Sequence, residues 1–293
     1  MSQTYDFAKW ASTVFVGALF ISSPVRATEI EILKQSDKWV ANFDNEACEL
    51  IAPFGEGDAK VLLRMSRFAP GDAFEFNVYG KRLGSFQGRG TVRVEFGPGG
   101  NAREAPALRA DVKGQPVLIL GRSDLLGRLY ERDITPPTIT PEQEAAITWV
   151  DLTLPRKSKF RVSFSSMAKP MRVMRTCLQS LVRSWGFDPD VQSKLSRKVE
   201  VMGNPGTWAT TNDYPKEMLR SGGQGIVRFR LDVNENGATT GCRIQQRTNP
   251  DGFATLTCQL MMKRAKFRPA LDSDGKAVKT FYVNAVRWAL PQG

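Results

Sequence analysis

The sequence predicts an α+β protein in which a large β-rich domain precedes a small mixed one. Segments of alternating apolar and polar residues, separated by Gly and Pro clusters, fill most of residues 28–200, and such alternation is typical of half-buried strands. Residues 213–293 instead follow the order helix, strand, strand, helix, strand. We therefore expect a β-rich domain over 28–200 with one or two helices, a linker over 201–212, and a small α/β domain over 213–293 with a three-stranded antiparallel sheet.

Residues 1–27 have the features of a secretory signal peptide. A mildly positive start that includes Lys9 precedes a stretch without charges, residues 10–21, and small residues stand at Val25 and Ala27. This apolar stretch is shorter than the roughly 20 residues that a membrane-spanning helix needs. We expect an exported protein from which the signal has been cleaved and in which no membrane anchor remains. An uncleaved anchor is the alternative.

The first domain is expected to contain at least seven strands and two helices. One strand surrounds Cys48, and the others are expected at 39–43, 60–68, 73–80, 90–97, 116–121 and 159–166. A short helix is expected over 124–132. A longer one over 171–186 has apolar residues at three- and four-residue spacing and ends at Gly186.

The second domain begins with a helix that Asn212 or Asp213 could cap and that stops at Gly222. The strand that follows turns Val227, Phe229, Leu231 and Val233 to one face and Arg228, Arg230 and Asp232 to the other. We expect the first face to be buried and the second to lie in solvent. The sequence Asn-Glu-Asn-Gly then predicts a turn, followed by a strand over 238–247, a helix over 249–267 and a last strand over 279–290.

Four cysteines, Cys48, Cys177, Cys242 and Cys258, lie beyond the predicted signal peptide. Their even number in an exported protein predicts disulfides. We expect Cys48 to pair with Cys177 within the first domain and Cys242 with Cys258 within the second. The sequence alone leaves the pairing open.

Composition argues against enzymatic chemistry and against metal or cofactor binding. The chain contains no histidine, so it lacks the base of Ser–His and Cys–His catalysis and a common zinc ligand. We predict no catalytic residue, no metal site and no cofactor. The net charge of +11 favours acidic partners, but export argues against nucleic acid.

Four short motifs occur in order in the second domain: Tyr214-Pro215, the glycines of 222–225, the turn 234–237, and Lys-Phe-Arg-Pro-Ala at 266–270. Together they resemble the C-terminal domain of TonB-type energy transducers over about residues 205–293. The resemblance covers none of the first domain.

The resemblance implies a docking module in the periplasm of a Gram-negative cell. In that family the last strand receives an extended segment of an outer-membrane receptor by β-strand addition. The corresponding edge here would carry Lys279, Phe281, Val283, Ala285 and Arg287.

The chain also departs from the family pattern, because it has no histidine, no Pro-rich spacer and no full-length spanning helix in its sequence. We therefore expect that it is not an autonomous energy transducer. An alternative function is that of a cell-envelope structural protein whose basic surface binds an acidic polymer such as peptidoglycan.

Overall fold

The computed structural model describes residues 30–128, 137–155, 158–248 and 252–290. Residues 31–293 cluster as one compact unit. The predicted signal peptide, residues 1–27, lies outside the described residues. Within those residues, no helix has the length and apolar character of a membrane span. We call residues 30–199 the N-terminal region and residues 200–290 the C-terminal region.

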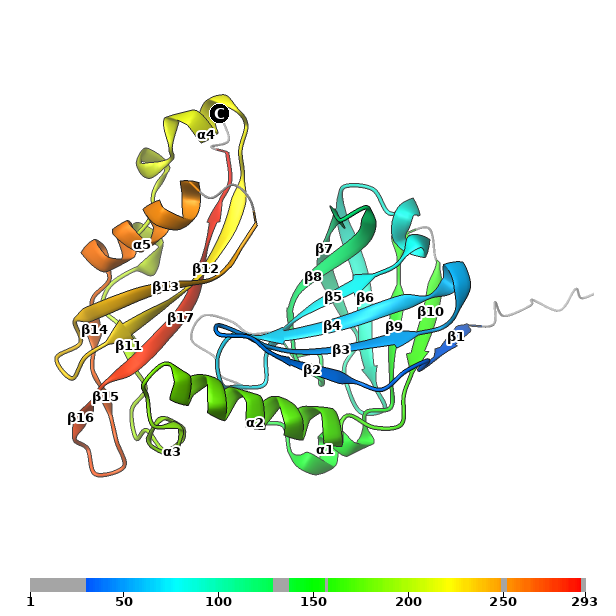
Figure 1. The fold of residues 1–293 in the computed structure, drawn as a ribbon, viewed down its shortest axis with the longest axis horizontal. Coiled ribbons are helices and arrows are strands. Elements are labelled where there is room, and N and C mark those ends of the chain that lie inside the picture. The colour runs from blue at the N-terminus through cyan, green and yellow to red at the C-terminus, as the bar shows by residue number, and fades with distance from the viewer. Residues whose placement is uncertain (1–29, 129–136, 156–157, 249–251, 291–293) are drawn as a thin grey trace, which may run out of the picture. The chain divides into compact units, whose positions relative to one another are not determined.

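The N-terminal region is built on a ten-stranded sheet with the order β1-β10-β9-β6-β7-β8-β5-β4-β3-β2 (Figure 1). Neighbouring strands are antiparallel except β1 and β10, which are parallel. The elements are β1 (Glu31–Lys34), β2 (Val40–Phe43), β3 (Cys48–Phe54), η1 (Gly57–Ala59), β4 (Val61–Arg67), β5 (Phe74–Tyr79), η2 (Lys81–Ser85), β6 (Arg89–Gly97), β7 (Arg103–Val112), β8 (Gln115–Ser123), α1 (Pro141–Ala146), β9 (Trp149–Thr153), β10 (Lys159–Ser163), α2 (Ala168–Ser184) and α3 (Pro189–Ser193).

The sheet closes on itself just after β1. Gln35 forms a bridge with Phe54 of β3, and the N–H of Gly55 donates to the Lys34 carbonyl at 2.9 Å. On its other side, the N–H of Gln35 donates to Ser163 of β10 at 3.1 Å. The segment after β1 therefore meets β3, the second-last strand of the order, and the inward side chains are enclosed.

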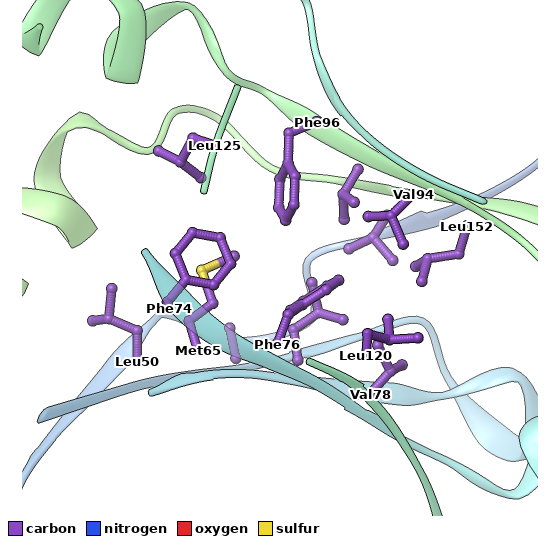
Figure 2. Packing of buried hydrophobic residues seen from close by; sticks show 14 of the residues in the cluster. Leu50, Met65, Phe74, Phe76, Val78, Val94, Phe96, Leu120, Leu125 and Leu152 are labelled. Carbon is purple, nitrogen blue, oxygen red and sulfur yellow. The ribbon is translucent and has the colours of Figure 1, made fainter. Parts of the chain in front are cut away.

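Large aromatic residues fill the enclosed interior. Phe54, Phe74, Phe76, Phe96 and Phe160 are each at most 1% exposed, and the rings of Phe76 and Phe96 lie 5.3 Å apart. Figure 2 shows side chains of β5 and β6 packed between the strands. Alternation along strands such as β6 supplies inward apolar residues, and the hydrophobic effect favours their enclosure by the sheet.

Helix α2 packs against the sheet near β2 and β3. It buries Met171, Met174 and Leu178 on one face, as expected from their spacing. Cys177 on this face forms a disulfide with Cys48 of β3, and Gly186, with φ +87°, ends the helical segment. The predicted pairing of these cysteines is present.

In the N-terminal region, three strands, β1, β7 and β9, and two helices, α1 and α3, were not expected from the pattern. Strand β7 buries Ala105 and exposes Leu108 and Val112, which is the reverse of the usual signal. In β9, Val150, Asp151 and Leu152 are all buried, so no alternation remains. Helix α1 begins with Thr140, whose side chain accepts from the Gln143 N–H in a capping box, and this signal is present in the sequence.

The helix expected over 124–132 is wrong for the residues that the structure describes. Residues 124–128 form a turn, in which the Asp124 carboxylate accepts from the N–H groups of Leu126 and Arg128. Asp124 is fully buried and also pairs with the Arg128 guanidinium. This side chain satisfies the backbone as a turn rather than as a helix. Residues 129–132 lie outside the described residues.

The C-terminal region contains a three-stranded antiparallel sheet in the order β13-β12-β17, with α5 packed on β12 and β13 (Figure 1). Its elements are β11 (Glu200–Val201), η4 (Pro205–Thr207), η5 (Thr211–Asp213), α4 (Lys216–Arg220), β12 (Gly225–Val233), β13 (Thr239–Arg247), α5 (Gly252–Arg264), β14 (Phe267–Arg268), β15 (Ala270–Leu271), β16 (Ala277–Val278) and β17 (Thr280–Trp288). The expected order of helices and strands is confirmed.

A second disulfide joins Cys242 of β13 to Cys258 of α5. It lies beside a core in which Phe229, Leu231 and Phe253 are at most 1% exposed. Strand β17 turns its side chains alternately to the two faces of the sheet. Its residues at even positions, such as Tyr282 and Trp288, pack with this core, whereas Phe281, Val283 and Ala285 lie on the opposite face of the sheet.

Removing each disulfide is expected to destabilise the protein to a different extent. The Cys48–Cys177 bridge spans 129 residues and the Cys242–Cys258 bridge spans 16, which corresponds to about 5 and about 3 kcal/mol of loop-closure entropy. Paired Cys→Ala variants compared by urea unfolding should follow that order. Equal losses would contradict the loop-length argument.

Candidate functional site

Strand β17 leaves one of its two edges open. It pairs with β12 on one side, and no other described strand pairs with its second side. An open edge presents backbone N–H and C=O groups to which another extended segment can bind. The predicted site residues Lys279, Phe281, Val283, Ala285 and Arg287 all belong to this strand or, for Lys279, directly precede it.

The contacts of β12, the central strand of this sheet, determine which residues of β17 face the open edge. The Ile226 carbonyl accepts from the Thr248 N–H, and the Asp232 carbonyl accepts from the Thr240 hydroxyl. Even-numbered residues of β12 therefore direct their backbone groups toward β13, and odd-numbered ones toward β17. In the register, Phe229 lies opposite Asn284 and Leu231 opposite Tyr282.

It follows that the even-numbered residues of β17 form the ladder with β12. The odd-numbered ones, Phe281, Val283, Ala285 and Arg287, direct their N–H and C=O groups outward. These are four of the five edge residues singled out from the sequence, although the sequence argument rested on a family resemblance and not on this geometry.

Two local contacts already occupy part of the edge. The Lys279 carbonyl accepts from the side chain of Gln192 in α3 at 3.0 Å. The N–H of Ala285 donates to Oδ1 of Asn284 at 2.8 Å, and Nδ2 of the same amide donates to the Tyr282 hydroxyl at 2.7 Å. Neither Gln192 nor Asn284 was singled out from the sequence.

The charged side chains of Arg228 and Arg230 on the face opposite α5 are buried, which corrects the expectation that they lie in solvent. Arg228 is 9% exposed and Arg230 is 4% exposed. Arg228 forms an ion pair with Glu75 of β5 and lies over the ring of Phe68, 4.6 Å from its centroid. The predicted alternation of β12 is present, but Arg228 and Arg230 are covered by the N-terminal region.

Arg230 makes a second set of contacts across the same interface. Its guanidinium lies 3.0 Å from Glu46 and from Asp232, and 4.3 Å from the centroid of the Trp185 ring. Burial raises the pKa of Glu46, since the loss of solvation outweighs the attraction of Arg230. Phe281 of β17 also contacts the N-terminal region, since its ring centroid lies 5.1 Å from that of Trp185.

The four sequence motifs of the C-terminal region contact one another in pairs. The Tyr214 hydroxyl donates to the Gly223 carbonyl, so the first motif fixes the loop before β12. Gly237 has φ +78°, and a Cβ at this position would lie 2.0 Å from the Phe267 carbonyl oxygen. The hairpin turn and the segment after α5 therefore approach so closely that only glycine fits.

Asp213 has a different role from the helix cap expected for it. Its carboxylate accepts two hydrogen bonds from the Arg264 guanidinium, at 2.6 and 2.8 Å, and others from the N–H and hydroxyl of Thr210. The bonds from Arg264, followed by those from Thr210, hold the pKa of Asp213 well below its usual range. The residue thus joins the start of this region to the end of α5.

The part of the chain that contains these motifs and the three-stranded sheet matches a known protein family. Residues 210–290 match the family described as Gram-negative bacterial TonB protein C-terminal. This TonB-type segment contains the three-stranded sheet, α5 and the open edge of β17. A comparison with curated proteins finds no match.

The buried pair of Arg228 and Glu75 is expected to couple the TonB-type segment to the N-terminal region. Replacing only one partner leaves the other charge buried and unpaired, so R228M and E75Q should each cost about 3 kcal/mol of unfolding free energy. The double variant should lose less than the sum of the two. Urea unfolding of all four proteins measures this coupling.

The ion pair of Arg268 and Glu200 provides a matched control for this double-mutant cycle, which compares the parent protein, the two single variants and the double variant. Nη1 of Arg268 lies 3.7 Å from Oε2 of Glu200, and the two side chains are 69% and 50% exposed. The coupling free energy of this exposed pair should therefore be below about 1 kcal/mol. If the two cycles give the same coupling energy, the interface does not depend on Arg228 as described.

The low pKa of Asp213 predicts a dependence of stability on pH. A carboxyl group with a lowered pKa stabilises the folded state above its unfolded pKa, about 3.9, and this contribution is lost as the pH falls further. D213N should therefore unfold at a lower temperature than the parent protein at pH 7, and the difference should shrink below about pH 4. D274N alters an exposed acid and should show no such trend. A constant difference across the pH range would contradict the assignment.

Proposed function

We propose that the protein is an exported periplasmic interaction module that binds an extended segment of a partner protein as an additional strand on β17, and that it is not an autonomous energy transducer. The open second edge of β17 is the observation that carries this proposal. The family match over 210–290 supports a TonB-like role in the envelope of a Gram-negative cell.

The backbone geometry favours β17 as the docking strand. Its outward groups extend from Phe281 to Arg287, a span that could hold a peptide of about four to six residues. Main-chain hydrogen bonds would supply the affinity, as in other cases of strand addition. The N-terminal region covers one face of this sheet through Arg228 and Arg230 but leaves the edge unpaired by any described strand.

A proline at Val283 provides a direct test. The Val283 N–H points outward, so V283P removes one edge donor and leaves the ladder with β12 in place. V283A removes most of the same side chain but keeps the N–H, and therefore serves as the matched control. With a synthetic peptide copied from the extended receptor segment that TonB-type domains receive, V283P should bind about fivefold more weakly than V283A, since one hydrogen bond is lost.

NMR titration of the full exported chain locates the peptide. Amide shifts are expected at Phe281, Val283 and Arg287, with smaller changes on β13. Shifts confined to β13, or equal binding by V283P and V283A, would count against docking on β17. The amides of Tyr282 and Val286 report whether the ladder with β12 survives in V283P.

A further inference from the structure

A recess of about 290 Å³ opens beside the middle of β17. The segment 68–75 of the N-terminal region forms one wall, and Val283 and Asn284 line the other. Arg122 and Lys198 also line it, as does the Arg228 that pairs with Glu75. The recess is therefore built by both regions of the chain, which form one compact unit.

Positive charge is in excess in this recess. Three cations line it, Arg122, Lys198 and Arg228, against the two acids Asp72 and Glu75. Both acids are engaged, because Asp72 accepts from the Ile139 N–H at 2.8 Å and lies 3.6 Å from Arg128, and Glu75 pairs with Arg228. Lys198 is exposed and forms no ion pair with the described residues.

The side chains of a strand added to β17 would alternate between the two faces of the sheet. Val283 lies on the face opposite α5, because it is paired with Arg230 in the register. Every second side chain of the added strand would therefore reach the same face, next to Val283 and the recess. In strand addition such pockets provide specificity, while the backbone provides affinity.

We propose that the recess accepts an acidic side chain of the segment that docks on β17. This inference rests on the proposed function. A Glu or Asp carboxylate would meet the ammonium group of Lys198 in a site with excess positive charge, whereas a Lys side chain would be repelled. The N-terminal region thereby takes part in the choice of partner, although the strand that receives the partner belongs to the TonB-type segment.

A set of host peptides tests this assignment in the full exported chain. The peptides alternate Thr and Val and carry Glu, Gln or Lys at the central position. Binding is measured by titration calorimetry, and its location by the NMR shifts of residues 281–287. The Glu peptide should bind about two- to fivefold more tightly than the Gln peptide, as expected for a partly exposed ion pair, and the Lys peptide should bind most weakly.

Two lysine variants separate the recess from general surface charge. K198Q should abolish the preference for Glu over Gln. K194Q changes another exposed lysine, at the end of α3, which does not line the recess, and should retain the preference. The preference should also decrease between low salt and about 0.5 M salt, because ions screen exposed charges.

The outcomes distinguish the two proposals. Equal binding of the Glu and Gln peptides on β17 would overturn the acidic recess and leave docking on β17 in place. A preference that survives in K198Q would also overturn it. Absence of any shift at residues 281–287 with all peptides would overturn both proposals.

Discussion

The burial of Arg228 and Arg230 on β12 is the constraint on which the arrangement of this protein depends. Two guanidinium groups are removed from solvent, and each is compensated by a carboxylate and an aromatic ring of the N-terminal region. A buried charge is tolerated only with such partners. The sheet of the TonB-type segment therefore has two covered faces, α5 on one and the N-terminal region on the other. The open edge of β17 remains accessible, as does the part of the second face at Ile226, which is 38% exposed.

The elements of the C-terminal region could be predicted from the sequence because local signals agree there with tertiary packing. Alternation of Val227, Phe229 and Leu231 gives β12, and Gly237 gives the turn after it. The N-terminal region was less predictable. Strand β7 has buried alanines and exposed large residues, and Asp151 is buried in β9 because Arg161 pairs with it. In both strands, packing against neighbours determines the structure, and a single-strand pattern does not reveal it.

In the candidate site, too, local sequence patterns predict the strand, whereas tertiary contacts determine its surroundings. The strand follows from the order of elements, and the family resemblance singled out residues of it, including Phe281 and Arg287, but which backbone groups face outward follows only from the register with β12. The environment of that strand could not be predicted from the sequence. Whether Arg228 faces solvent or a carboxylate depends on Glu75, which is 153 residues away in the sequence. The roles of Asn284 and Gln192 depend equally on contacts that no local pattern encodes.

The contact between Asn284 and the Ala285 N–H has a consequence for behaviour at high concentration. A continuous row of free donors and acceptors is a template on which identical chains can stack and finally precipitate. Here the row is interrupted, because Ala285 has its donor bonded internally and Lys279 has its acceptor bonded to Gln192. A second copy of the chain thus meets an incomplete ladder. The side chains of Asn284 and Gln192 therefore reduce the number of free backbone groups on this edge that a second copy could bind.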